Sequence, residues 1–378
     1  MDPAYRRHAR RAGLVVADPE RFAVRRIRAG QAGGRPRFRY RDAATGRSPG
    51  REIVALIASL GIPPAWTDVR CADDPRAHIL AVGTDGAGRQ QYVYNPRWER
   101  VREAIKAERL LRFGRALPRI RAAIERDLAR ATRGTRPARG APARLAPALA
   151  ARLVDRAAMR PGNEAYAAGG TRGATTLLRG DVRAEGGTVR LRYVGKAGKA
   201  HDVSLRDAAA ARALAALKRL QRQRRAAGRR AAGRRTGAQR GEGRRARLFV
   251  VPGADGAARR LTAATLNRYL VEAAGEAVSA KDFRTFHGSA RALAVLHERR
   301  ASETETARRA ALAEASRAAS ERLRNTPAVA RASYVLPSIV AAFETGALPD
   351  GLMRGPSRKG LDRAETALMR HMEAVVRG

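Results

Sequence analysis

The sequence has 378 residues, with 77 Lys or Arg against 35 Asp or Glu and a formal charge of +42. A chain of this length can form two domains. A surface with so much charge of one sign repels itself unless a polyanion neutralises it, so we expect a nucleic-acid partner and strongly salt-dependent binding. A high genomic GC content also enriches Arg and Ala, and composition alone leaves that explanation open.

Cysteine usage and hydropathy exclude several classes of protein. Cys71 is the only cysteine, which excludes an intramolecular disulfide and a cysteine-based metal cluster. The six histidines show no spacing typical of metal ligands, so we expect no metal and no cofactor. The arginine-rich N-terminus lacks the apolar segment of a signal peptide, and no apolar run is long enough to span a bilayer. We therefore expect a cytoplasmic, nucleoid-associated protein with no membrane contact.

The first predicted elements are a basic arm and a small β-rich domain. Residues 1–35 are rich in Arg and Gly with little periodicity, which indicates a mobile arm. From Phe38 to about Tyr94 apolar and polar residues alternate on both sides of an Asp85-Gly86-Ala87-Gly88 turn, which predicts strands and a hairpin. We assign residues 36–97 to an N-terminal DNA-binding domain.

The remainder of the chain is predicted to be mainly helical. Apolar residues recur at helical spacing from Leu110 to Leu128, and a further helix is expected from about Pro147 to Arg160. Residues 188–205 alternate again and predict a second hairpin, with its loop at 195–199. Residues 219–247 form a basic low-complexity insertion, which we interpret as a flexible linker, with a DNA-tracking arm as the alternative. The fold class is therefore α+β, with a larger helical domain over residues 98–378 that carries one β-hairpin.

Four separated segments carry side chains suited to chemistry on a phosphodiester. In chain order they supply Arg160, Lys196, Lys281, Arg284, Asn325 and Tyr334. Each is a weak signal alone, because a lone Arg is usually a surface ion-pair partner and a lone helical Tyr usually packs. As an ordered set they are more specific, because a phenol among cations can attack phosphorus and leave as an aryl ester.

Further motifs occur in the same order along the chain. They are Gly61–Val69, Gly83–Pro96, Leu111–Pro118, Gly173–Leu177, Gly195–Lys199, Leu323–Val329 and Ser333–Val335. Together they resemble the type IB DNA topoisomerases of the small bacterial and poxvirus type, from about Gly61 to Pro337. The resemblance implies the catalytic fold shared by tyrosine recombinases and type IB topoisomerases.

The resemblance also implies a role for each site residue. Tyr334 would attack the scissile phosphate, which gives a 3′-phosphotyrosyl strand and a free 5′-hydroxyl. Arg160 and Arg284 would hold the two non-bridging oxygens, and Lys196 would protonate the departing 5′-oxygen. Asn325 stands where many relatives carry histidine and would donate a hydrogen bond without charge. Relaxation of supercoiled DNA would need neither ATP nor a metal ion, since the phosphotyrosine retains the energy of the ester bond.

The expected partner is double-stranded DNA, clamped by a monomer whose two lobes join near residues 95–102. The side chains expected to contact DNA are Gln91, Tyr92, Tyr94, Lys199 and Lys281. A structural role is the alternative for the first three: the two tyrosines would pack on one face of the sheet, and Gln91 would face solvent.

Three residues depart from the family's pattern. Pro161 follows Arg160 where an apolar residue with an N–H is usual, so it cannot donate a backbone hydrogen bond. Arg324 replaces a common glycine, and a positive φ there would cost about 1 kcal/mol. His287 stands where a small residue is usual, and we expect it to be packed or DNA-facing. Because of these departures, a degraded or slow enzyme is an alternative interpretation of the sequence.

Two other functions remain open from the sequence. A tyrosine recombinase would share the fold and the chemistry, but it usually carries a His-x-x-Arg box, whereas this chain has Lys281-Asp282-Phe283-Arg284. A non-catalytic nucleoid-associated protein would need only the charge and the fold.

Overall fold

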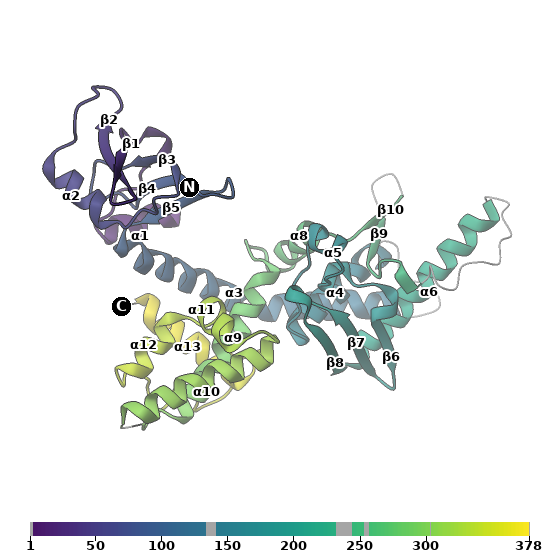
Figure 1. The fold of residues 1–378 in the computed structure, drawn as a ribbon. Helices are drawn as coiled ribbons and strands as arrows, with labels where there is room; N and C mark the ends of the chain where they lie inside the picture. Colours follow the sequence, from purple (N-terminus) through teal and green to yellow (C-terminus); the bar gives the residue numbers. More distant parts are fainter. Residues whose placement is uncertain (1–2, 134–140, 232–243, 253–256, 303, 378) are drawn as a thin grey trace. The chain divides into compact units, whose positions relative to one another are not determined.

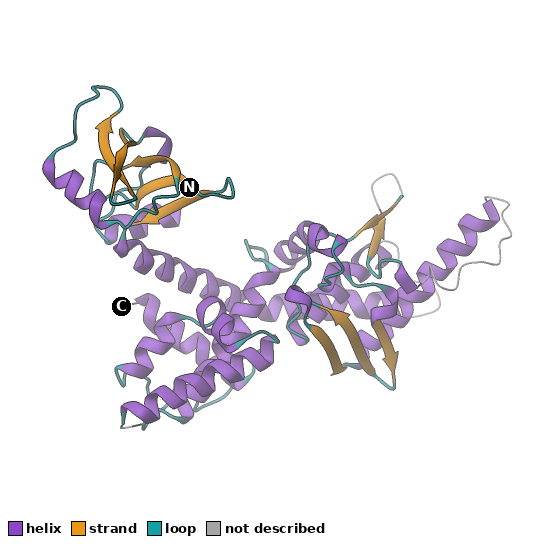
Figure 2. Cartoon of the chain, viewed as in Figure 1, coloured by secondary structure: helices purple, strands orange, loops and turns teal. Residues whose placement is uncertain are grey.

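The computed structural model describes residues 3–133, 141–231, 244–252, 257–302 and 304–377 (Figure 1). Its contacts divide the chain into two units, Met1–Glu108 and Arg109–Gly378. Helices occur together with small antiparallel sheets, as the α+β prediction requires (Figure 2). The division lies inside one long helix, α3, which extends from Pro96 to Thr132.

The first unit is built on a five-stranded antiparallel sheet with the order β2-β1-β3-β4-β5. Its elements are α1 (Pro3–Arg11), β1 (Val24–Ala32), β2 (Arg35–Asp42), α2 (Arg51–Ser59), β3 (Thr67–Cys71), β4 (Ile79–Thr84) and β5 (Gln90–Tyr94). Ile57 of α2 is buried with Val24, Val69, Cys71 and Ala81, which attaches the helix to the sheet. The predicted hairpin around residues 85–88 is confirmed as β4–β5.

The mobile arm predicted for residues 1–35 is wrong for the described part of that segment. Residues Pro3–Arg11 form α1, and Val24 of β1 pairs with Asp42 and Cys71 on its two neighbouring strands. Ala9 and Leu14 are buried against Trp98. The segment is ordered because partners far along the chain complete its sheet and its core, and a local composition signal cannot detect such partners.

The second unit is mainly helical. Its elements after α3 are α4 (Ala141–Arg156), α5 (Glu164–Ala168), β6 (Val182–Glu185), β7 (Thr188–Val194), β8 (Ala200–Arg206), α6 (Ala208–Ala231), β9 (Val250–Pro252), β10 (Ala258–Arg260), α8 (Ala263–Ala274), α9 (Ala280–Glu298), α10 (Glu305–Leu323), α11 (Pro327–Tyr334), α12 (Pro337–Glu344) and α13 (Arg363–Arg377). Strands β6, β7 and β8 form an antiparallel sheet against which α6 packs (Figure 1). The second predicted hairpin is confirmed as β7–β8.

Two predicted boundaries differ from the structure. Helix α4 ends at Arg156, so Arg160 lies in the segment after the helix and not in its last turn. The basic insertion predicted at 219–247 begins as the continuation of α6, which extends to Ala231. Residues 232–243 of that insertion lie outside the described residues.

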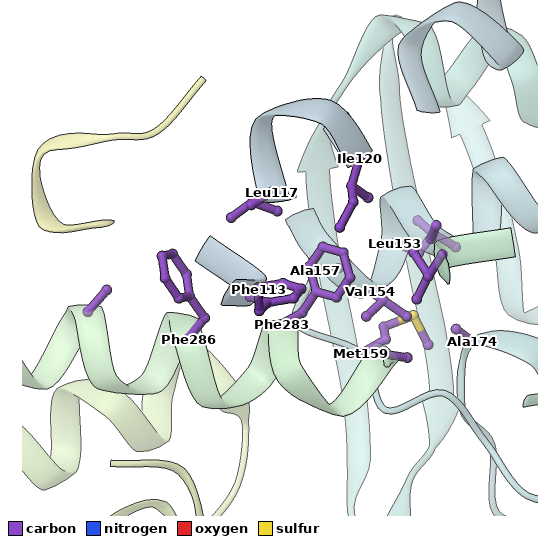
Figure 3. Close-up of a cluster of buried hydrophobic side chains, with 14 of the residues drawn as sticks. Phe113, Leu117, Ile120, Leu153, Val154, Ala157, Met159, Ala174, Phe283 and Phe286 are labelled. Carbon is purple, nitrogen blue, oxygen red and sulfur yellow. The ribbon is translucent and has the colours of Figure 1, made fainter. Parts of the chain in front are cut away.

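The core of the second unit surrounds α9, which α4, α8, α10, α11, α12 and α13 all contact. On α9, Phe283 and Phe286 meet the ring of Phe113 edge to face, at centroid distances of 4.8 and 5.6 Å (Figure 3). Gly114 allows this close approach, because a Cβ there would lie 2.7 Å from the ring of Phe286. The dense packing gives α9 a fixed position from which its polar side chains can organise a site.

Candidate active site

Tyr334 is the last residue of α11, where α9 fixes its backbone. Helix α11 begins after Thr326, whose hydroxyl caps the Val329 amide. The hydroxyl of Ser289 on α9 donates to the Tyr334 carbonyl at 3.0 Å and accepts from the amide of Leu336 at 3.1 Å. The chain on both sides of Val335 is thereby tied to one buried serine, which restricts where the phenol can lie.

Arg284 lies five residues before this serine on α9, and its side chain is almost fully buried. Only 2 % of it is exposed, and its Nη2 donates to the Leu323 carbonyl at 3.1 Å. Its Nη1 donates to the Ala158 carbonyl. The guanidinium carbon lies 4.8 Å from the centroid of the Tyr334 ring. Burial and the charge of Arg160 lower the pKa of Arg284, but a guanidinium starts so high that it stays charged.

Arg160 is held by a close crossing of two backbone segments. The Arg160 carbonyl accepts from the Ala174 amide at 2.8 Å. Gly162 has a φ of +100°, and a Cβ on Gly173 would lie 2.6 Å from its Cα, so this crossing excludes a side chain at Gly173. Pro161 fits because only its carbonyl is used, as the acceptor for the Thr175 amide at 2.8 Å. The missing N–H of this proline therefore leaves the crossing intact.

The two arginines change the acidity of the phenol. Burial raises the pKa of Tyr334, but the charges of Arg284 and Arg160 outweigh burial and lower it below the ordinary value. A lower pKa increases the phenolate fraction at neutral pH, and the phenolate is the nucleophilic form. The same two charges lie where negative charge would build on a phosphorus bound beside the phenol.

Asn325 lies between α10 and α11, directly after a left-handed residue. Arg324 has a φ of 53°, so the positive φ considered for this position is present. The Asn325 amide donates to the Ser320 carbonyl at 3.1 Å. Its side-chain Nδ2 and Oδ1 are both buried, and neither has a hydrogen-bond partner within the described residues. Buried amides are normally paired, so this one is suited to bind a ligand oxygen.

Lys196 lies away from this arrangement. It is exposed at the start of the short turn Lys196–Gly198 between β7 and β8, and among the described residues it has no hydrogen bond or ion pair. The Gly195 amide donates to the Lys199 carbonyl at 2.7 Å and closes the loop. Lys199 and Lys281 are also exposed. The structure thus groups the two arginines with the tyrosine and leaves the predicted general acid on an exposed loop.

The strand residues next to this loop are influenced by the arginines of the site. Tyr193 on β7 stacks on His201 of β8, with ring centroids 4.8 Å apart. Burial lowers the pKa of His201, and the charges of Arg324, Arg160 and Arg284 lower it further. This pair links the hairpin electrostatically to the arginines, and nothing in the spacing of the sequence indicated it.

The residues that fix the segment before Arg160 were also missed from the sequence. Arg322 donates to the carbonyls of Asp155 and Arg156 at 3.1 and 3.0 Å, and Arg324 donates to that of Ala157. Arg284 donates to the carbonyl of Ala158, which is the next one along the chain. Three arginines therefore bind four consecutive carbonyls at the end of α4. Positive charge at a helix C-terminus is favourable, because it pairs with carbonyls that lack partners within the helix.

Comparisons with known proteins identify the family of the chain. Residues 95–337 match the family described as eukaryotic DNA topoisomerase I, catalytic core. Residues 37–85 match the family described as bacterial DNA topoisomerase IB, N-terminal domain. The chain belongs to the type IB DNA topoisomerases. It is 28% identical over 289 residues to a protein named DNA topoisomerase 1B from Acanthamoeba polyphaga mimivirus, which covers 75% of this chain and 77% of that protein.

The family match identifies the chain as a DNA topoisomerase of type IB, and it decides against the tyrosine recombinase considered from the sequence. In the part of the chain that the structure describes, no helix is long and apolar enough to cross a membrane. Within the same residues, no group of three or more His, Cys, Asp or Glu side chains is arranged so that it could hold a metal ion.

The topoisomerase N-terminal unit carries the other predicted DNA contacts. Tyr92 and Tyr94 lie on one face of β5 with 38 % and 42 % of their surface exposed, and their ring centroids are 6.0 Å apart. The amide of Gln91 donates to Asp85 at 2.8 Å, so it is held by the neighbouring turn. Both tyrosines are therefore accessible, whereas Gln91 would have to exchange a partner to contact DNA.

Proposed function

We propose that this type IB topoisomerase relaxes supercoiled double-stranded DNA by transient cleavage of one strand, through a 3′-phosphotyrosyl intermediate at Tyr334. The observation that carries the proposal is the position of the Arg284 guanidinium, 4.8 Å from the centre of the Tyr334 ring. Arg160 adds a second charge that acts on the same phenol. A nucleophile with a lowered pKa and two cations beside it are the groups that attack on a phosphodiester needs.

In the cleavage step the Tyr334 oxygen forms a bond to phosphorus, and the bond from phosphorus to the 5′-oxygen breaks. Arg284 and Arg160 stabilise the charge on the non-bridging oxygens, and the unpartnered Asn325 amide donates to one of them. The phenolic proton is lost before or during attack, which the lowered pKa of Tyr334 favours. Because the new ester keeps the energy of the old one, the 5′-hydroxyl can reverse the attack without ATP.

The departing 5′-oxygen needs a proton, and we assign this role to Lys196. Lys196 is exposed, as are the other residues 197–199 of its loop. We propose that the loop folds onto the bound duplex and brings the ammonium to the leaving oxygen. Catalytic contacts of this kind often form only in the complex with substrate. Because Arg284 and Arg160 supply the positive charge beside the phosphate, the proposed cleavage step requires no metal ion.

We propose that DNA binds as duplex to a single copy of the chain. Support comes from the formal charge of +42 and from exposed Tyr92, Tyr94, Lys199 and Lys281. Hydroxyl and ammonium groups contact phosphates without reading sequence, which suits an enzyme that acts at many sites. A cytoplasmic, nucleoid-associated location would follow from this affinity.

The test is relaxation of supercoiled plasmid without ATP and with EDTA, by the wild type and by Tyr334→Phe. We expect the wild type to relax the plasmid and the variant to bind DNA without relaxing it. A covalent adduct trapped on nicked duplex should map to Tyr334 by mass spectrometry. Relaxation by Tyr334→Phe, or an adduct on another residue, would refute the assignment.

A further inference from the structure

Four charged side chains, three of them buried, form a cluster that joins α9 to α3, α4 and α13. Arg121 of α3 binds Asp155 of α4 through two bonds of 3.0 Å, and binds Glu365 of α13 at 2.7 and 2.8 Å. His287 of α9 completes the cluster. Asp155, Glu365 and His287 are 1 %, 3 % and 5 % exposed, so these charges must neutralise one another without help from water.

The geometry of His287 identifies its protonation state. Its Nε2 lies 2.9 Å from an oxygen of Asp155, and its Nδ1 lies 3.4 Å from an oxygen of Glu365. A neutral imidazole has one N–H and one lone pair, so one nitrogen would then face a carboxylate oxygen with its lone pair. Only the imidazolium donates on both sides. With two carboxylates, one guanidinium and one imidazolium, the cluster has no net charge.

The cluster is directly connected to the catalytic segment. Asp155 is also the first of the four residues whose carbonyls are bound at the end of α4, and the fourth, Ala158, is bound by Arg284. Ala158 has a φ of 49°, a conformation that an L-residue keeps only when its surroundings hold it. His287 lies one turn after Arg284 on α9. The ion pair between His287 and Asp155 therefore ties the helix that carries Arg284 to the segment that leads to Arg160.

We propose that His287 is a positioning residue for strand cleavage: as an imidazolium it holds the end of α4 against α9, so that Arg160 and Arg284 meet at the Tyr334 phenol. This inference rests on the proposed function. The charged groups that act on His287 are Asp155 and Glu365, each of which also binds Arg121, and Arg322 of α10 as an opposing charge. Burial lowers the pKa of His287, but the two carboxylates outweigh burial and raise it, in agreement with the geometry.

The test compares His287→Gln with the double variant His287→Gln/Glu365→Gln. The single variant leaves one uncompensated buried negative charge, and the double variant removes that charge. We measure the single-turnover rate of covalent adduct formation on nicked duplex, the Kd for the same duplex, and the thermal unfolding midpoint. His371→Gln is the matched control, because His371 is a buried histidine whose side chain has one hydrogen bond in the described part of the chain, to the hydroxyl of Ser338 at 3.1 Å.

We expect His287→Gln to slow adduct formation by about tenfold to a hundredfold with an unchanged Kd, since small misplacements of catalytic groups cost this much. The double variant should recover much of the rate, and His371→Gln should resemble the wild type. A wild-type rate in His287→Gln, or a double variant slower than the single one, would overturn the proposal. If instead the wild type forms no adduct at Tyr334, the proposed function itself has failed.

A second measurement needs no folded variant at position 287. Nitrogen NMR of labelled histidine at pH 7.5, in a His8→Gln background, reports protonation of the remaining imidazoles. The background removes His8 because this side chain also faces a carboxylate, 2.9 Å away on Glu108. We expect one imidazole to be doubly protonated, and a spectrum in which every imidazole is neutral would overturn the proposal.

Discussion

Substitution of Ser289 tests whether α9 fixes the nucleophile. Ser289 is 0 % exposed, and its hydroxyl bonds both the Tyr334 carbonyl and the Leu336 amide. The amide of Val335 between them is bonded separately to Ala330 at 3.2 Å. Ser289→Ala thus leaves one buried carbonyl and one buried N–H without a partner, directly beside the residue that attacks.

The size of the effect follows from these two groups. A buried polar group left without a partner costs about 1–3 kcal/mol. Two such groups therefore predict a loss of roughly 2–6 kcal/mol in the free energy of unfolding, at about 2–4 °C in the unfolding midpoint for each kcal/mol in a large domain. Adduct formation should slow by about tenfold or more, because the backbone of Tyr334 is freed at the reacting residue.

Thermal unfolding and single-turnover cleavage of nicked duplex measure the two effects. The control is Ser316→Ala on α10, because the buried Ser316 hydroxyl donates only to the Leu312 carbonyl of its own helix, at 2.7 Å. This control should lose less than about 1 kcal/mol and no cleavage rate. If Ser289→Ala resembled Ser316→Ala in both measurements, α9 would not be what positions the tyrosine.

Three further predictions concern charge. Arg284→Ala should slow adduct formation by about 10²–10³ with DNA binding retained. Arg284→Lys should recover only part of the rate, because a guanidinium donates hydrogen bonds in two directions at once and an ammonium does not present the same planar pair of donors. Full activity of either variant in single-turnover assays would contradict the role of Arg284. Arg324→Gly should change the free energy of unfolding by less than about 1 kcal/mol in urea titrations, because glycine adopts a positive φ without strain and this gain offsets the lost hydrogen bond to the Ala157 carbonyl. Cleavage should nevertheless slow, and a wild-type cleavage rate would argue against a role of the Arg324–Ala157 bond in catalysis. Burial opposes ionisation of Glu365, but Arg121 outweighs burial and lowers the pKa of Glu365 to about 2. The ionised Glu365 therefore stabilises the folded state above about pH 4.5, and this contribution is lost as the pH falls toward 2. Between pH 6 and pH 3 the unfolding midpoint of the wild type should therefore fall further than that of Glu365→Gln, and equal falls would contradict the assigned ion pair.

Local patterns in the sequence were sufficient for elements whose partners are close along the chain. Alternation around residues 85–88 and 195–199 gave the two hairpins, and helical spacing from Leu110 to Leu128 gave the centre of α3. The order of short motifs gave the family, which the matches over residues 37–85 and 95–337 confirm. Local patterns failed for residues 3–32, because α1 and β1 depend on Trp98 and on β3 for their contacts.

The sequence by itself determined which reactive side chains are available: two arginines, an asparagine and a tyrosine, in an order that resembles type IB topoisomerases, on a chain with a large positive charge. Only the tertiary structure decided which of these meet. It brings Arg284 to the Tyr334 ring, leaves Lys196 exposed on its loop, and buries His287 between two carboxylates. The physical reason is that spacing along a chain reports neighbours one or two turns away, whereas the bonds at the end of α4 join carbonyls to arginines more than a hundred residues later.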